Sequence, residues 1–158
     1  MNSQERRNHV NKILQDKTNF RELSNTDFMK STVENRNDFE AEDIYSSAGS
    51  KNILVVFTAG QSGTPLRQVF DFYLSKNIET GIYTISKESN DPLIEITYSE
   101  FDPTQPSAHN NYSYIAFKGI LNLFVKTTTL KYDGSLEATF KDRNNNNLTS
   151  NGTFSFTL

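Results

Sequence analysis

The stretch Gly152-Thr153-Phe154-Ser155-Phe156-Thr157-Leu158 decides the fold class of this chain. Large apolar side chains alternate in it with small or polar ones, without interruption. Successive side chains of a β-strand point to opposite faces, so this period of two predicts a strand with one buried face. Such a strand must be paired in a sheet, and the same alternation recurs upstream, at Leu136, Ala138 and Phe140. The sequence therefore predicts a mainly β protein built from antiparallel sheets.

Further strands are expected upstream of this segment, at residues 38–45, 51–58, 67–74, 81–86, 94–99, 112–132 and 135–141. Residues 51–58 are apolar on both faces, which predicts a central strand between the second sheet and the N-terminal helices. In residues 94–99, the alternating Glu95, Thr97 and Ser99 are predicted to form a solvent-exposed face.

Three connections between strands can be predicted from local sequence. Residues 67–74 and 81–86 read as a strand pair joined through the six residues between them. Asp133-Gly134 tolerates the positive φ angles of a type I′ turn, which predicts a hairpin there. Gly119 lies inside the long segment 112–132, and we expect the chain to bend around it.

The first 37 residues predict helix instead of strand. Ser3 is expected to cap a helix whose apolar positions are Val10, Ile13 and Leu14. Ser24 is expected to cap a second short helix, which would carry Phe28, Met29 and Val33 on one side. The chain is thus predicted to be one domain, with residues 1–37 a helical segment packed on a β-sandwich of residues 38–158. A partly open β-barrel is the alternative architecture.

Composition excludes several function classes. The net charge is −3 and is spread evenly, which disfavours binding to nucleic acid or to an anionic membrane surface. The longest apolar run, residues 53–57, is far shorter than the ~20 residues that span a bilayer, so no membrane span is predicted. No cysteine is present to form a disulfide, a thiolate nucleophile or a Cys-based metal site. No apolar segment follows Arg6 and Arg7 as in a secretory or lipoprotein signal, and a cytoplasmic location is expected.

The residues that most often carry chemistry are sparse. His9 and His109, the two histidines, lie about a hundred positions apart, which predicts ordinary surface roles. Residues 142–146 have the first oxygen positions of a calcium loop, but Asn147 and Thr153 stand where the loop requires Gly and Glu. We therefore predict no catalytic residue, no metal site and no cofactor.

One loop is long enough to bind a partner. Residues 102–111 are rich in proline and asparagine, and the candidate binding residues at its end are His109, Asn110, Asn111, Tyr112 and Tyr114. The two tyrosines alternate onto one face, where a row of rings could contact a sugar or a protein. The alternative is that both rings fill one side of the sandwich. The Asn-rich loop 142–151 is expected on the same side of the molecule.

Four segments carry a family resemblance: Gly81-Ile82-Tyr83-Thr84-Ile85, Ala116-Phe117-Lys118-Gly119-Ile120-Leu121, Leu136-Glu137-Ala138-Thr139-Phe140 and Asn151-Gly152-Thr153-Phe154-Ser155-Phe156. Over residues 67–158 this cadence resembles small bacterial β-sandwich domains of unknown function, many of which are lipoproteins. The resemblance implies a β-sandwich and a bacterial origin, and it implies no catalytic residues. The lipoprotein signal of that group is not seen in this sequence.

The sequence therefore leads to three ranked hypotheses of function. The first is a non-enzymatic binding or interaction module that engages a protein partner or a second copy of itself. The second is a carrier of a small apolar ligand, with a barrel-like cavity lined by Phe70, Phe72, Phe117 and Phe124. The third is an enzyme of unknown class, which would require acidic residues or histidines to converge in the fold.

Overall fold

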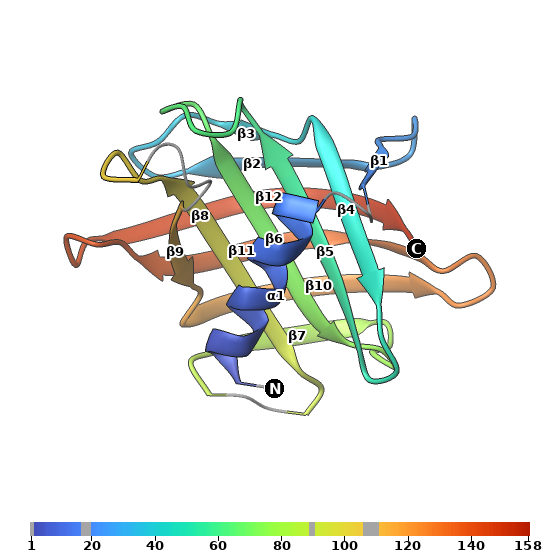
Figure 1. Ribbon diagram of the computed structural model, residues 1–158. Helices are drawn as coiled ribbons and strands as arrows, with labels where there is room; N and C mark the ends of the chain where they lie inside the picture. Colours follow the sequence, from blue (N-terminus) through green and yellow to red (C-terminus); the bar gives the residue numbers. More distant parts are fainter. Residues whose placement is uncertain (1, 17–19, 89–90, 106–110) are drawn as a thin grey trace.

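The computed structural model describes residues 2–16, 20–88, 91–105 and 111–158, which form one helix and two antiparallel sheets (Figure 1). The helix is α1 (Ser3–Asp16). In spatial order, sheet A contains β1 (Phe20–Glu22), β4 (Asp43–Ala48), β5 (Asn52–Ala59), β6 (Gln68–Ser75), β8 (Ile94–Phe101) and β9 (Asn111–Ile115). Sheet B contains β3 (Phe39–Glu40), β2 (Phe28–Val33), β12 (Asn147–Thr157), β11 (Lys131–Lys141), β10 (Lys118–Lys126) and β7 (Gly81–Ser86).

The two sheets lie face to face, with their strands running in crossed directions, and α1 lies across the outer face of sheet A (Figure 1). This arrangement confirms the predicted β-sandwich, in preference to a partly open barrel. The chain passes from sheet A to sheet B at Ala116 and Phe117, between β9 and β10. Gly119, just beyond this corner, has a φ of 147°. A Cβ there would lie 2.0 Å from the carbonyl oxygen of Glu137, so the predicted bend depends on glycine.

Aromatic rings fill the space between the sheets. Phe72 of sheet A packs edge-to-face on Phe154 of sheet B, with ring centroids 4.8 Å apart. Phe70 packs in the same way on Phe39 at 4.9 Å. The segment that decided the fold class is β12, which pairs with β2 and β11 and therefore lies inside sheet B. Phe154 and Phe156 are buried, as predicted, but Ser155 between them is also only 3% exposed, so burial does not alternate along the whole strand.

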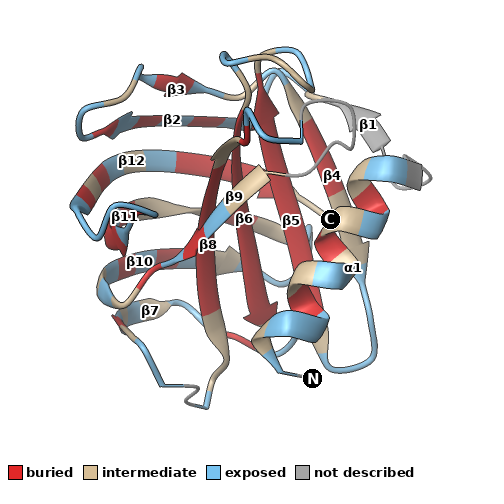
Figure 2. Cartoon of the chain, turned by 60° about the vertical axis from the view of Figure 1, so that its left-hand side comes forward, coloured by how far each residue is buried: buried red, intermediate tan, exposed pale blue. Residues whose placement is uncertain are grey.

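Helix α1 is held to sheet A by apolar and charged contacts. Val10 and Ile13 pack on the outer face of β5 and β6, beside Leu54 and Val56. This cover makes β5 buried on both faces, as predicted (Figure 2). The helix is capped by Asn2, not by Ser3. Asn2 Oδ1 accepts the N–H of Glu5 at 2.9 Å, and Glu5 Oε2 accepts the N–H of Asn2 at 2.7 Å.

The second predicted helix is wrong. Ser24 and Asp27 do bond to each other, since Ser24 Oγ donates to Asp27 Oδ2 at 3.1 Å, but the pair closes a turn. Strand β2 follows directly, with Met29, Ser31 and Val33 buried and the residues between them exposed, which is strand alternation. The apolar residues that had suggested a helix face thus belong to sheet B.

The predicted hairpin at Asp133-Gly134 is also wrong. Both residues lie inside β11, and the chain reverses at residues 127–130, where Leu130 has a positive φ of 52°. Gly134 is required for another reason. A Cβ at this position would lie 2.0 Å from the carbonyl oxygen of Asn122 and 2.9 Å from the ring of Phe154. Glycine here makes room for packing, not for a turn.

Three further predictions about the strands are wrong. Strands β6 and β7 do not pair, since β6 lies between β5 and β8 whereas β7 pairs with β10 in the opposite sheet. The face of β8 that carries Glu95, Thr97 and Ser99 is buried, not solvent-exposed. Helix α1 covers the start of this face, and Ser99 is bonded to Ser113 of β9 at 2.9 Å. The acidic segment 38–45 likewise forms no single edge strand, because the chain crosses from β3 to β4 within it.

Candidate ligand-binding site

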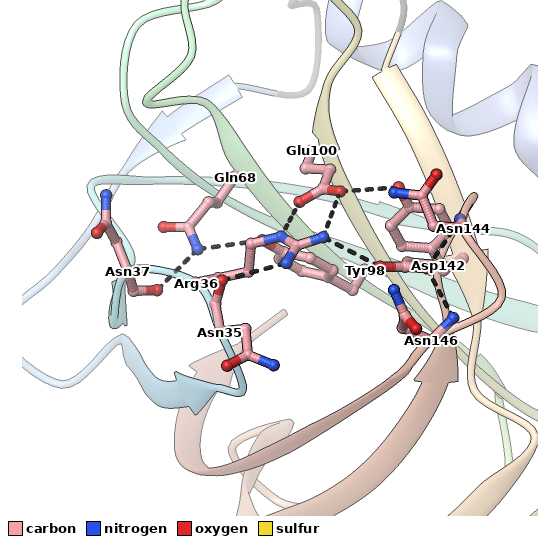
Figure 3. Close-up of polar contacts among 10 residues, drawn as sticks. Asn35, Arg36, Asn37, Gln68, Tyr98, Glu100, Asp142, Asn144 and Asn146 are labelled. Atoms are coloured by element: carbon pink, nitrogen blue, oxygen red, sulfur yellow. Dashed lines mark hydrogen bonds and ion pairs between the residues drawn. The ribbon is translucent and has the colours of Figure 1, made fainter.

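The turn after β2, the end of β8 and the turn after β11 meet at one end of the sandwich, around Arg36 (Figure 3). Arg36 lies in the turn after β2 and binds the carboxylate of Glu100, on β8, through two nitrogen atoms at 2.6 and 3.1 Å. Its Nη2 also reaches Asp142, at the end of β11, at 3.4 Å. The guanidinium therefore joins the two sheets across the end of the sandwich.

Tyrosines extend this network into the core. The hydroxyl of Tyr114 donates to Glu100 Oε1 at 2.8 Å. Burial, followed by the bond to Glu100, raises the pKa of Tyr114, and burial raises the pKa of Tyr98 to about 12. Both tyrosines thus remain neutral hydrogen-bonding groups at physiological pH.

The calcium-like segment 142–146 is a turn closed by its own backbone. Asp142 Oδ1 accepts the N–H groups of Asn144 and Asn146, both at 2.9 Å. These bonds, led by that of Asn146, and the guanidinium of Arg36 lower the pKa of Asp142. The carboxylate is thus satisfied by the turn and by Arg36. Within the described ranges, no group of three or more His, Cys, Asp and Glu residues is placed to hold a metal ion.

Of the five candidate binding residues, His109 and Asn110 lie outside the described residues. Asn111 begins β9 opposite Phe101. Tyr112 is partly buried, with the guanidinium of Arg143 4.5 Å from its ring centroid. Tyr114 is only 7% exposed and packs in the core, so the two tyrosines do not form an exposed row of rings. A binding role for this loop stays a prediction.

A cavity of about 610 Å³ opens elsewhere, at the edge of the sandwich. It lies beside the start of β8, whereas Glu100 is near the end of that strand. The cavity is lined by the first residues of α1, the end of β7, the start of β8, the corner between β9 and β10, and Lys141 of β11. Five separate segments of the chain, drawn from both sheets and the helix, thus form it.

The floor of the cavity is apolar. Ile94, Ile115, Ala116 and Phe117 form it. Ile115 is 38% exposed, so part of this aliphatic side chain is open to solvent at the cavity. An apolar floor at a sheet edge is where a ligand would replace solvent.

The walls and rim of the cavity are polar. Ser3 Oγ donates to Glu95 Oε2 at 2.9 Å, and Arg6 forms a buried ion pair with the same carboxylate. Across the opening, the ammonium of Lys141 lies 5.7 Å from the ring centroid of Phe117. The remaining polar lining is Asn2, Ser86, Lys87 and Glu88.

The four phenylalanines predicted to line a carrier cavity do not share one. Phe70 and Phe72 are fully buried and packed against other rings, as described above. Phe124 is half-exposed on the outer face of sheet B. Only Phe117 reaches the edge cavity, so the predicted barrel-like interior is replaced by a filled core with a cavity at its side.

Comparisons with protein-family models, curated proteins and solved structures gave no match for this chain. Helix α1, the one helix in the described residues, is too short and too polar to cross a membrane. Three exposed apolar side chains, Ile82, Ile120 and Phe124, lie close together on the outer face of β7 and β10. Nothing in the described part of the chain covers them, and both a protein partner and self-association stay predictions.

The cavity could not have been found from sequence, because its residues carry no common motif. Lys141 and Phe117 look like ordinary members of alternating strands, and Ile94 like a core residue. Only the pair Arg6-Arg7 offered a signal. Both side chains form ion pairs with strands of sheet A, Arg6 with Glu95 and Arg7 with Asp71, so the two arginines lie where the helix contacts the sheet.

Proposed function

We propose that this protein is a non-catalytic binding protein that holds one small organic ligand in the edge cavity. The observation that carries the proposal is the cavity itself. Its volume of about 610 Å³ falls within the roughly 300–1,000 Å³ typical of small-molecule sites. An apolar floor with a few polar groups at the rim is also the usual composition of such a site.

The arrangement of polar groups supports binding over catalysis. Glu95, the acidic group in the cavity wall, already accepts hydrogen bonds from Ser3 and Arg6. His9 lies farther along α1, where its Nδ1 is 3.2 Å from the hydroxyl of Tyr73. These residues are engaged in attaching the helix, and the rim lysines are the groups left to orient a ligand.

Native mass spectrometry of the protein purified from its own host tests the proposal. We expect the native protein to carry one retained small molecule per chain. Ile115→Trp should abolish that extra mass, because the larger ring occupies the cavity while its half-exposed position tolerates the change. Ile120→Trp, an equally exposed isoleucine on the outer face of sheet B, is the control and should retain the ligand. Retention of the same ligand by Ile115→Trp would contradict the proposal.

A further inference from the structure

We infer that the ligand of the edge cavity is an amphiphile with a single negative charge. In this arrangement its apolar body lies on Ile94, Ile115 and Phe117, and its anionic head group lies beside Nζ of Lys141. The inference rests on the proposed function, because it assigns a ligand class to the same cavity.

The buried wall of the cavity contributes no free charge. Arg6 and Glu95 form an ion pair, and Arg6 Nη2 also donates to Ser3 Oγ at 3.1 Å. Both charged side chains are more than nine-tenths buried. Since the two charges cancel, this wall presents no net charge to a ligand.

The rim carries an excess of positive charge. The opposite charges of the adjacent residues Lys87 and Glu88 cancel in the total charge of the lining. Lys141 has no acidic residue in the lining to cancel its charge. In the part of the chain that the structure describes, no carboxylate lies within ion-pairing distance of Lys141. The cavity therefore presents one uncompensated cation.

The position of Lys141 places this cation at the junction of apolar and polar surface. Its ammonium lies over the ring of Phe117, whose π face attracts a cation without using its N–H donors. An ammonium has three such donors, which stay available to a carboxylate, sulfate or phosphate ester at the mouth. A ligand whose body covers Phe117 would bring its head group to this point.

A cationic ligand fits the same cavity poorly. It would lie near Lys87 and Lys141, while the carboxylate of Glu95 is already neutralised by Arg6. A neutral apolar ligand would fit the floor but would leave Lys141 without a partner. The charges of the lining thus favour a monoanion.

Two fluorescent probes separate these possibilities. 8-Anilinonaphthalene-1-sulfonate and N-phenyl-1-naphthylamine share one aromatic body, and only the first carries a permanent negative charge. We expect both to bind at one site, the sulfonate roughly two- to fivefold more tightly, as a partly exposed ion pair allows. Lys141→Met should remove this advantage and change the affinity of the neutral probe by less than about twofold.

Lys126→Met is the matched control, because Lys126 is exposed at the far end of β10 and does not line the cavity. It should change neither affinity. Equal affinities for the two probes in the wild type, or an equal loss of both in Lys141→Met, would overturn the inference and leave cavity binding intact. Failure of both probes to bind, or binding that Ile115→Trp does not weaken, would instead overturn the proposed function.

Discussion

Asp71 is a buried carboxyl group under α1, and its titration should be visible in the stability of the protein. Its side chain is 1% exposed, and Arg7 Nη2 lies 2.6 Å from Oδ1. The other oxygen, Oδ2, has no hydrogen-bond partner among the described residues. Burial raises the pKa of Asp71 from 3.8 to about 6, although the charge of Arg7 opposes the shift.

The sign of the effect follows from the raised pKa. Between about pH 4 and pH 6 the folded protein binds the proton of Asp71 more tightly than the unfolded chain does. Stability from this group is therefore present at low pH and is lost as the pH rises. A shift of about two pH units corresponds to roughly 3 kcal/mol in full, of which about 2 kcal/mol is lost between pH 4 and pH 7.

Urea unfolding of the wild type and of Asp71→Asn at pH 4, 5, 6 and 7 measures this contribution. Other carboxylates titrate in both proteins, so the difference between their free energies of unfolding isolates Asp71. We expect that difference to move in favour of the variant by about 2 kcal/mol from pH 4 to pH 7. Asp133→Asn, at a half-exposed position, should stay within about 0.5 kcal/mol throughout. A flat difference for Asp71→Asn, or one that moves against the variant as the pH rises, would refute the reasoning.

Three further predictions test the fold by chemical denaturation. Phe72→Ala removes a fully buried ring and should lower the free energy of unfolding by about 3–5 kcal/mol, so a loss below about 1 kcal/mol would contradict the packed core. Arg36→Met should cost about 1–2 kcal/mol, and its effect should be less than additive with Glu100→Gln; full additivity would mean that the two side chains do not interact. Gly134→Ala should cost more than about 2 kcal/mol because its Cβ has no room, whereas Gly49→Ala should be nearly neutral, and equal effects would refute the packing role of Gly134.

Periodicity in the sequence predicted those elements whose burial is uniform along their length. The C-terminal strand alternates in sequence because Phe154 and Phe156 both pack on rings of sheet A. Residues 53–57 are apolar throughout because one face of the strand packs on sheet B and the other on α1. In such segments, the order of apolar and polar residues directly reflects which side chains are buried.

Local signals misled where one residue type serves two purposes. Ser24 and Asp27 form a side-chain bond that is common to helix caps and to turns, and the strand after them decided between the two. Gly134 stands in a strand because Phe154 needs its space, which no local pattern could reveal. The burial of Thr97 could not be predicted locally either. Part of its face of β8 is covered by α1, which lies some eighty residues earlier in the sequence.

The edge cavity lies beyond local sequence altogether. Its floor and rim come from segments as distant as Ser3 and Lys141, and the connection of β6 to the opposite sheet decides where the edge opens. If β6 had paired with β7, as the sequence predicted, different strands would lie at the edge of the sandwich where the cavity opens. A site made by topology can be predicted only once the strand order is known.

The most direct test of the central claim is a ¹⁵N NMR titration of the protein with 8-anilinonaphthalene-1-sulfonate. The account predicts that the largest amide shifts occur at Ser86, Ile94, Ile115, Phe117 and Lys141, which surround the edge cavity. Shifts concentrated instead at the exposed apolar residues of β7 and β10, or around Arg36, would contradict it.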